Sequence, residues 1–307
     1  MFDVCLLGTG GMAPLPKRAL TSCLIRFGGS SLLIDCGEGT QATLREQGWS
    51  FKDIDYIFFT HYHGDHISGL PGLLLSIGNC DRTEPLTLVG PKGLQYFAEG
   101  LLRIARELPF ELKYVELAPS DLGQKRMFGP FRVTPFEAKH GVVCYGYRVE
   151  IERLPLFDAA RAQKNGVPLN CWNKLQHGVS VTAEDGTIYT PDMVLGEPRK
   201  GLSIAYCTDS RPVPAIAEGA RGVDLFICEG MYGDEDAEER ARNHMHMSFQ
   251  EAARLAAEAG VGELWLTHYS PALPNPKPHL SAAQAIFANT KAGKDRLTKE
   301  FVFEDEK

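Results

Sequence analysis

Short apolar segments alternate with amphipathic segments along most of this chain. The apolar segments have the length of buried strands, and the amphipathic segments have the 3.6-residue period of helices. We predict strands at 2–7, 22–27, 31–34, 57–59, 86–89, 111–117, 127–137, 145–151, 202–207, 224–228 and 263–267. We predict helices at 40–47, 71–77, 91–107 and 249–259, and a charged lid or helix at 233–242. Strands that alternate with helices, together with strand-only stretches, predict α/β layers with mixed sheets.

The residues after the predicted strand 57–59 are dense in metal-binding side chains. His61, His63, Asp65 and His66 lie within six residues, and imidazole and carboxylate are ligands for zinc, manganese and iron. His61 and His63 are two residues apart and can face one ion, whereas Asp65 and His66 can face a neighbouring ion. The alternative is a solvated histidine-rich loop. That alternative does not explain why the loop lies between a buried strand and a Gly-Pro turn.

Other candidate ligands stand where predicted strands give way to loops. His140, Asp209 and His268 each lie at the end of an apolar segment, and ligands gathered at one edge of a sheet converge in space. Asp35 also ends a strand, shortly before the histidine loop. It is suited equally to holding a metal-bound imidazole and to capping the helix that follows.

Composition narrows the class of protein. The chain has 307 residues, of which 44% are hydrophobic and 23% are charged, as in soluble globular proteins. No apolar run reaches the ~20 residues needed to cross a bilayer, and the first residues lack the basic start of a signal peptide. We therefore expect a cytoplasmic protein without a membrane partner.

The eight cysteines show no C-x-x-C spacing, which indicates reduced core residues. The net charge of −7 disfavours nucleic acid only weakly, because a metal centre can bind phosphate.

The segment 152–200 differs in character from the rest of the chain, because polar, aromatic and basic residues occur there with little periodicity. We interpret it as an insertion. It could be a flexible arm that grips a partner, since cations contact phosphate and an indole stacks on a base. The candidate side chains are Arg161, Lys164, Trp172 and Lys174. The alternative is an elaborated loop in a dimer contact, and composition leaves the two open.

Several longer motifs contain or adjoin candidate functional residues: Phe59-Thr60-His61-Tyr62-His63-Gly64-Asp65-His66, Gly69-Leu70-Pro71-Gly72-Leu73-Leu74, Asp209-Ser210-Arg211, His246 with Glu251-Ala252-Ala253, and Leu266-Thr267-His268-Tyr269-Ser270. Through these motifs the chain resembles the ribonuclease Z family of tRNA 3′-processing endonucleases, within the metallo-β-lactamase superfamily. The histidine motif marks the superfamily. The Gly-Leu-Pro-Gly-Leu-Leu and His-x-x-x-x-Glu-Ala-Ala patterns are narrower, and the similarity runs over most of the chain.

This resemblance implies an αββα sandwich of two mixed β-sheets flanked by helices. It implies a single domain over 1–307, with an inserted arm at about 152–200. It also implies two divalent metal ions, expected to be Zn²⁺, although Mn²⁺ and Fe²⁺ suit the same donors. The implied ligands are His61, His63 and His140 for the first ion, Asp65, His66 and His268 for the second, and Asp209 as the bridge.

The resemblance implies catalytic roles as well. Asp65 would orient or deprotonate water, and His246, paired with Glu229, would be the proton donor. His244 competes for that role on sequence alone, but only His246 has the family spacing to Glu251.

The implied activity is cleavage of precursor tRNA after the discriminator base by a homodimer. One alternative is a small or cyclic phosphodiester substrate, because the place of the family's Gly-Pro-rich arm motif reads Val167-Pro168-Leu169-Asn170-Cys171-Trp172. A second alternative is a non-catalytic scaffold, which the intact ligand set disfavours.

Overall fold

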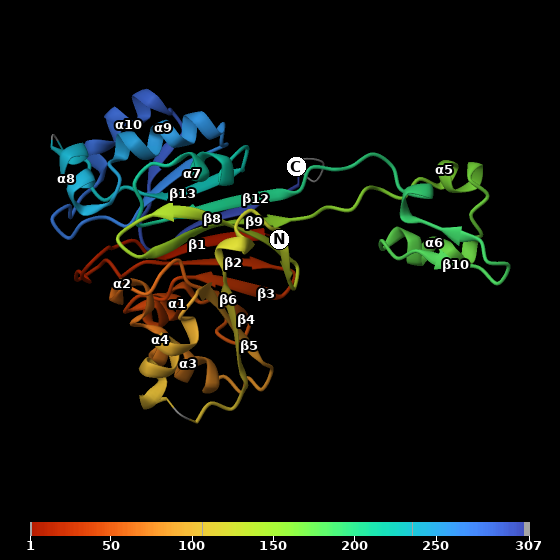
Figure 1. The fold of residues 1–307 in the computed structure, drawn as a ribbon, viewed down its shortest axis with the longest axis horizontal. Helices are drawn as coiled ribbons and strands as arrows, with labels where there is room; N and C mark the ends of the chain where they lie inside the picture. Colours follow the sequence, from red (N-terminus) through yellow and green to blue (C-terminus); the bar gives the residue numbers. More distant parts are fainter. Residues whose placement is uncertain (1, 106, 235, 304–307) are drawn as a thin grey trace. The chain divides into compact units, whose positions relative to one another are not determined.

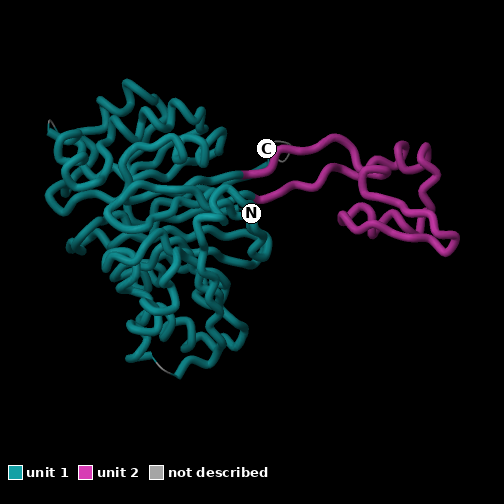
Figure 2. Tube along the Cα trace, in the orientation of Figure 1, with its two compact units in different colours: residues 1–150, 203–307 teal, residues 151–202 magenta. Residues whose placement is uncertain are grey.

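The computed structural model describes residues 2–105, 107–234 and 236–303, and the chain forms two compact units (Figure 2). Unit 1 consists of Met1–Glu150 and Ser203–Lys307, and unit 2 of Ile151–Leu202. Unit 2 covers nearly the same residues as the insertion predicted at 152–200.

The first sheet of unit 1 is built mainly from the N-terminal part of the chain. Its strands are β1 (Phe2–Gly8), β2 (Ser22–Phe27), β3 (Ser30–Ile34), β4 (Ile54–Phe58), β5 (Leu86–Pro91), β6 (Leu112–Leu117) and β16 (Leu297–Phe301). They follow the order β16-β1-β2-β3-β4-β5-β6. Pairing is antiparallel from β16 to β3 and parallel from β3 to β6, so the sheet is mixed.

The second sheet is also mixed, and it corrects one prediction. Its strands are β7 (Arg126–Phe128), β8 (Phe131–Lys139), β9 (Val143–Ile151), β12 (Leu202–Cys207), β13 (Leu225–Glu229), β14 (Leu264–Thr267) and β15 (Thr290–Ala292), in the order β15-β14-β13-β12-β9-β8-β7. The single strand predicted at 127–137 is wrong. Gly129, with a positive φ of 56°, and Pro130 form a turn that separates β7 from β8.

Helices cover the outer faces of both sheets (Figure 1). Those beside the first sheet are α1 (Thr40–Gln47), α2 (Gly64–Ile67), α3 (Leu70–Gly78) and α4 (Leu94–Leu101), which continues into the 3₁₀ turn η1 (Leu102–Ile104). Those beside the second are α7 (Pro214–Gly219), α8 (Ala237–His244), α9 (Phe249–Ala259) and α10 (Leu280–Ile286). Short 3₁₀ turns also occur at η2 (Pro119–Asp121), η3 (Pro191–Met193) and η4 (Lys277–His279). The predicted αββα sandwich is confirmed.

The helix predicted at 91–107 is shorter in the structure. Pro91 is the last residue of β5, and Gly93, with φ of 100°, turns the chain so that α4 begins at Leu94. The left-handed conformation of Gly93 is one that a residue with a Cβ adopts at a cost. The apolar periodicity of this segment therefore extends beyond the helix that it forms.

Unit 2 has its own secondary structure and a small core. It contains α5 (Ala159–Lys164), α6 (Leu169–Gln176) and a hairpin of β10 (Val181–Thr182) and β11 (Ile188–Tyr189). The core consists of Ala162, Val167, Cys171, Leu175, Val194 and Leu195. The weak periodicity of the sequence did not predict these elements, because each of the two helices contributes only a few apolar side chains.

The structure also describes the cysteines and the lengths of the helices. The eight cysteines are free, and all except Cys80 are buried, so the prediction of free core thiols is confirmed for seven of the eight. Among the described residues, no helix has both the length and the apolar character needed to cross a membrane.

Candidate metal centre

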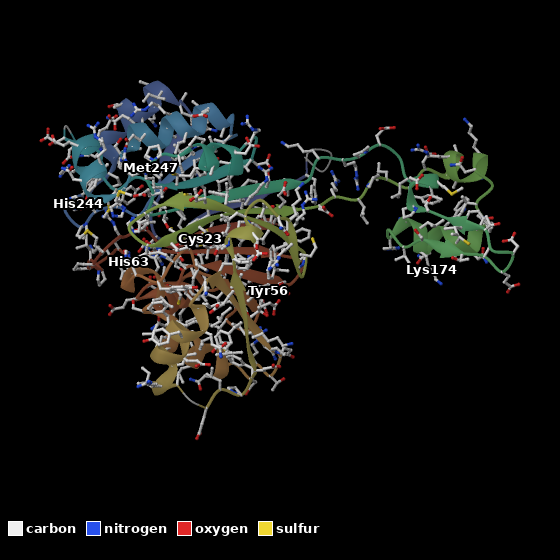
Figure 3. All side chains as sticks on the ribbon, viewed as in Figure 1. Cys23, Tyr56, His63, Lys174, His244 and Met247 are labelled. Atoms are coloured by element: carbon white, nitrogen blue, oxygen red, sulfur yellow. The ribbon has the colours of Figure 1, made fainter. Side chains whose placement is uncertain are left out.

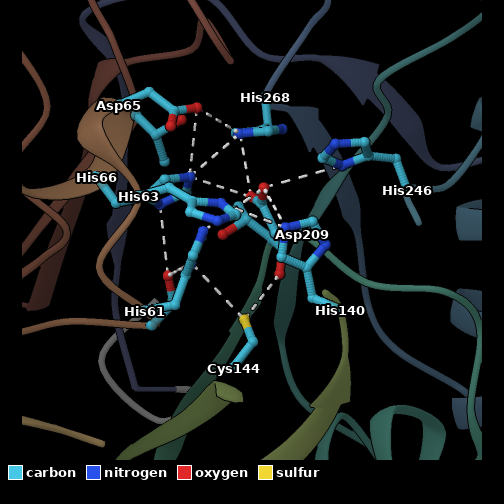
Figure 4. A network of polar contacts seen from close by, with 12 residues as sticks. His61, His63, Asp65, His66, His140, Cys144, Asp209, His246 and His268 are labelled. Atoms are coloured by element: carbon cyan, nitrogen blue, oxygen red, sulfur yellow. Dashed lines mark hydrogen bonds and ion pairs between the residues drawn. The ribbon is translucent and has the colours of Figure 1, made fainter. Parts of the chain in front are cut away.

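The predicted ligands converge at one edge of unit 1 (Figure 4). Among the described residues, three groups of side chains have their donor atoms within 4.8 Å of one another. The first is His61, His63, His140 and Asp209, and the second is Asp65, His66 and His268. The third, Asp209, His246 and His268, shares a residue with each of the other two. The first two groups contain the residues that the resemblance assigned to two ions and their bridge. The histidine loop follows β4 of the first sheet, whereas His140, Asp209 and His268 follow β8, β12 and β14 of the second.

Asp209 lies between the two groups. Its Oδ1 is 3.1 Å from Nε2 of His66 and 3.0 Å from Nε2 of His268. Its Oδ2 is 3.8 Å from Nε2 of His61 and 3.7 Å from Nε2 of His140. Each carboxylate oxygen therefore faces a different group, which is the geometry of a carboxylate that bridges two cations.

Unusual backbone conformations place several of these groups. Asp209 and His268 have positive φ values of 53° and 56°, which are uncommon for residues other than glycine and cluster at functional sites. A Cβ on Gly11 would lie 2.6 Å from the ring of His268, so only glycine fits there. The next residue, Met12, donates its backbone N–H to Oδ2 of Asp65 at 2.7 Å. Sequence reasoning did not identify Met12, because a backbone donor leaves no side-chain signal.

Asp35 holds one of the imidazoles in place. Its Oδ2 is 2.9 Å from Nδ1 of His66, and its Oδ1 accepts the backbone N–H of Thr60 at 2.8 Å. This leaves Nε2 of His66 facing the centre, as expected of a partner to a metal ligand. The alternative role for Asp35 as a helix cap is wrong, because α1 begins after Gly39 without a side-chain cap.

The donor set fits divalent metal ions. Burial lowers the pKa of His61, and its Nε2 is buried without a hydrogen-bond partner among the described residues. Burial disfavours the carboxylate of Asp65, but His268 and His66 hold its pKa well below the usual range. Neutral imidazole and ionised carboxylate are the forms that bind metal. Burial also opposes the charge on His66, yet Asp209 beside it raises its pKa.

His246 lies next to this centre and is oriented by Glu229. Nδ1 of His246 is 3.0 Å from Oε2 of Glu229, which is fully buried. Burial disfavours the imidazolium, but the Glu229 carboxylate outweighs it and raises the pKa of His246 to about 9. The ring of His246 is 5.2 Å from that of His140. His244, by contrast, is exposed, so the structure brings only His246 to the centre.

The candidate substrate-binding side chains lie in unit 2. Lys164 and Lys174 are exposed, and Figure 3 shows Lys174 on α6. Trp172 is partly buried: its Nε1 donates to the Val167 carbonyl at 2.9 Å, and its ring lies 4.9 Å from that of Phe157. The indole thus stabilises unit 2, and stacking of Trp172 on a base stays a prediction.

Full-length relatives decide the family. The chain is 55% identical over 306 residues to "Ribonuclease Z" of Lachnospira eligens and 51% identical over 306 residues to "Ribonuclease Z" of Agathobacter rectalis, and each alignment covers 100% of both proteins. The chain belongs to the ribonuclease Z family. A model of another family, "Anti-Pycsar protein Apyc1", matches residues 2–102, so its similarity covers only the N-terminal part of this ribonuclease Z family member.

Solved structures support the same fold. The metallo-β-lactamase fold protein YhfI from Bacillus subtilis aligns with a TM-score of 0.70 and 23% identity, covering 98% of this chain and 99% of that chain. The short form of human tRNase Z aligns with a TM-score of 0.68 and 23% identity, covering 97% and 98%. These similarities show the metallo-β-lactamase fold, while the ribonuclease Z relatives show the family.

Proposed function

We propose that this protein is a metal-dependent endoribonuclease that removes the 3′ trailer of precursor tRNA in the cytoplasm. The observation that carries the proposal is the position of Asp209 between two groups of metal-binding side chains. Full-length relatives named ribonuclease Z favour this substrate over a small or cyclic phosphodiester. The Apyc1 model, which matches only residues 2–102, does not outweigh them.

We propose Zn²⁺ as the resident ion at both positions. His61, His63 and His140 would hold one ion, Asp65, His66 and His268 the other, and Asp209 both. Imidazole with carboxylate is a donor set that zinc prefers, and Mn²⁺ and Fe²⁺ accept it too. The chemistry that such a pair supplies when bound is Lewis acidity, which lowers the pKa of water and offsets charge on a phosphate.

The protein's own residues then move the protons. Asp65 orients the attacking water and accepts its proton, while its Oδ2 is fixed by the Met12 backbone N–H. Water adds to phosphorus, and the bond from phosphorus to the 3′-oxygen of the discriminator nucleotide breaks. His246, held charged by Glu229, donates its proton to that oxygen. The tRNA thus leaves with a 3′-hydroxyl, and the trailer carries the phosphate.

The test is to map cleavage sites on precursor tRNA while measuring hydrolysis of bis(p-nitrophenyl) phosphate. We expect one major cut after the discriminator base with a 3′-hydroxyl on the tRNA. We also expect slower turnover of the small ester, which lacks the contacts that position tRNA. Hydrolysis of the ester without any cleavage of precursor tRNA would reject the tRNA substrate and leave the phosphodiesterase chemistry intact.

We also propose a homodimer, in which the inserted arm of one subunit serves the active site of the other. Its interface would include the exposed apolar side chains of α4 and the turn after it, where Tyr96 and Ile104 are each 78% exposed and Phe97 is 44% exposed. Neighbouring exposed side chains of this kind mark interaction surfaces more often than single ones do.

Replacing Ile104 and Tyr96 with glutamate tests this surface. We expect the wild-type protein to sediment at about twice its 33.8 kDa chain mass. The double variant should sediment at the chain mass, because burying an unpaired carboxylate in the interface is costly. Met127→Glu is the control, since Met127 is also an exposed apolar residue (57%) but lies on β7. A double variant that sediments like the wild type would place the interface elsewhere or show that the protein is a monomer.

A further inference from the structure

The side chain of Arg211 is largely buried and binds the segment that carries His246. The guanidinium is 15% exposed and forms an ion pair with both carboxylate oxygens of Glu251, which is 9% exposed. Its Nη1 also donates to the backbone carbonyl of His246. A planar guanidinium with several fixed donors holds its acceptors in one geometry, which a single ammonium cannot do.

Glu251 connects this contact to a helix. It is the third residue of α9, and its Oε2 accepts the backbone N–H of Ser248 at 3.0 Å. The Ser248 hydroxyl in turn accepts the Glu251 N–H at 3.2 Å, which completes a capping box. The guanidinium of Arg211 therefore links the His246 carbonyl to the first turn of α9, and α9 packs in the hydrophobic core against the second sheet.

The backbone around Arg211 reaches the metal centre at the same time. The Arg211 N–H donates to the Lys139 carbonyl at 2.8 Å, and the Lys139 N–H donates to the hydroxyl of Ser210 at 2.8 Å. Ser210 donates its own N–H to Glu229. Ser210 and Arg211 thus bind Lys139, which precedes His140, and Ser210 also binds Glu229, which orients His246.

The His246 segment also contacts His140 directly. Met245, in the left-handed conformation with φ of 62°, has its carbonyl oxygen 3.1 Å from Nδ1 of His140. Displacement of this segment would therefore move His246 relative to His140. Arg211 opposes such a displacement, because its side chain binds the His246 carbonyl.

We propose that Arg211 is a positioning residue for proton donation: by holding the His246 carbonyl against α9, it fixes the imidazole at the distance from the metal centre that leaving-group protonation requires. This inference rests on the proposed function, in which His246 is the donor. Arg211 does not touch the reacting atoms. Its loss should therefore affect the steps that need a proton from His246 and spare those that do not.

Two substrates separate these steps. The ribose oxygen that leaves from RNA needs a proton, whereas p-nitrophenolate leaves without one. For Arg211→Met we expect kcat on precursor tRNA to fall about 30-fold, within the range of general acid catalysis. KM for precursor tRNA should change little, hydrolysis of bis(p-nitrophenyl) phosphate should stay within about 3-fold of the wild type, and bound zinc should be unchanged. Arg211→Lys, which keeps the charge, should lose less.

A double variant shows whether Arg211 acts through His246. If it does, Arg211→Met combined with His246→Asn will cleave precursor tRNA no more slowly than His246→Asn alone, because the two changes remove the same effect. Arg132→Met is the matched control, since Arg132 pairs with Glu150 on β8 and β9 and its loss should leave both activities unchanged.

Three outcomes would overturn the inference. Additive losses in the double variant would show that Arg211 acts independently of His246. Equal losses on both substrates together with loss of zinc would show that Arg211 stabilises the metal centre. If Arg211→Met does not fold, the same two activities and the zinc content are compared for Arg211→Lys. Full activity of Arg211→Met on precursor tRNA would remove its role. If the wild type does not cleave precursor tRNA at all, the proposed function fails, and that result is distinct from the other three.

Discussion

Asp209→Asn should lower kcat on both precursor tRNA and bis(p-nitrophenyl) phosphate by about 1,000-fold, or ~4 kcal/mol at about 1.4 kcal/mol per tenfold. The reason is that Asp209 faces both ligand groups with one oxygen each, so loss of its charge weakens both ion sites. Asparagine is the suitable replacement, because it keeps the shape of the side chain and tolerates the positive φ of this position. We expect bound metal, measured by elemental analysis, to fall from two equivalents to one or fewer.

A matched control and a second measurement make this result interpretable. Asp121→Asn changes an aspartate that pairs with Arg126 at 2.7 Å, away from the ligand groups, and should leave metal content and both activities unchanged. Circular dichroism would show whether Asp209→Asn is folded. A folded Asp209→Asn protein with two equivalents of metal and full turnover would contradict the bridging role.

Excision of the arm should lower activity on precursor tRNA and spare the small ester, whereas Asp209→Asn should lower both. If residues 153–199 are replaced with a short Gly-Ser linker, we expect kcat/KM on precursor tRNA to fall about 100-fold, or ~3 kcal/mol of lost contacts. Hydrolysis of the small ester should stay within about 3-fold of the wild type. The excision is feasible because the two ends meet: a Cβ on Gly201 would lie 2.2 Å from the Ile151 carbonyl oxygen.

Point variants in the arm show whether its charges carry the effect. Lys164 and Lys174 are exposed, so replacing both with alanine should leave the small core of unit 2 intact. Because phosphate contacts are screened by salt, we expect weaker binding of precursor tRNA at low salt and a shallower salt dependence. Lys113→Ala, an exposed lysine of β6, is the control. Unchanged tRNA cleavage after excision would favour the alternative of a dimer-contact loop.

His61, His140, Asp209 and His268 could be singled out from the sequence because each stands where an apolar strand ends, whereas the full set of candidate ligands came from the family resemblance. Such strands can be recognised from their run of apolar residues. If they belong to one sheet, their ends lie along one edge of it. The backbone conformations at that edge were not predictable in the same way. Asp209 and His268 have left-handed φ values, but neither is a glycine, so the sequence carries no signal for this conformation.

Other features escaped prediction because their signals are long-range. The guanidinium of Arg211 meets the His246 carbonyl and Glu251, which lie 35 and 40 residues further along the chain, and an arginine next to a proline indicates nothing of this by itself. The helices of unit 2 are short, and they pack against Val194 and Leu195 from a loop outside them, so tertiary packing outweighs local propensity there.

The split origin of the ligands has a consequence for folding as well as for chemistry. Four candidate ligands come from the segment after β4 and three from the ends of β8, β12 and β14, so bound ions would cross-link the two layers of the sandwich. Metal affinity is then folding free energy, and scarcity of metal in the cell would shorten the lifetime of the protein along with its turnover.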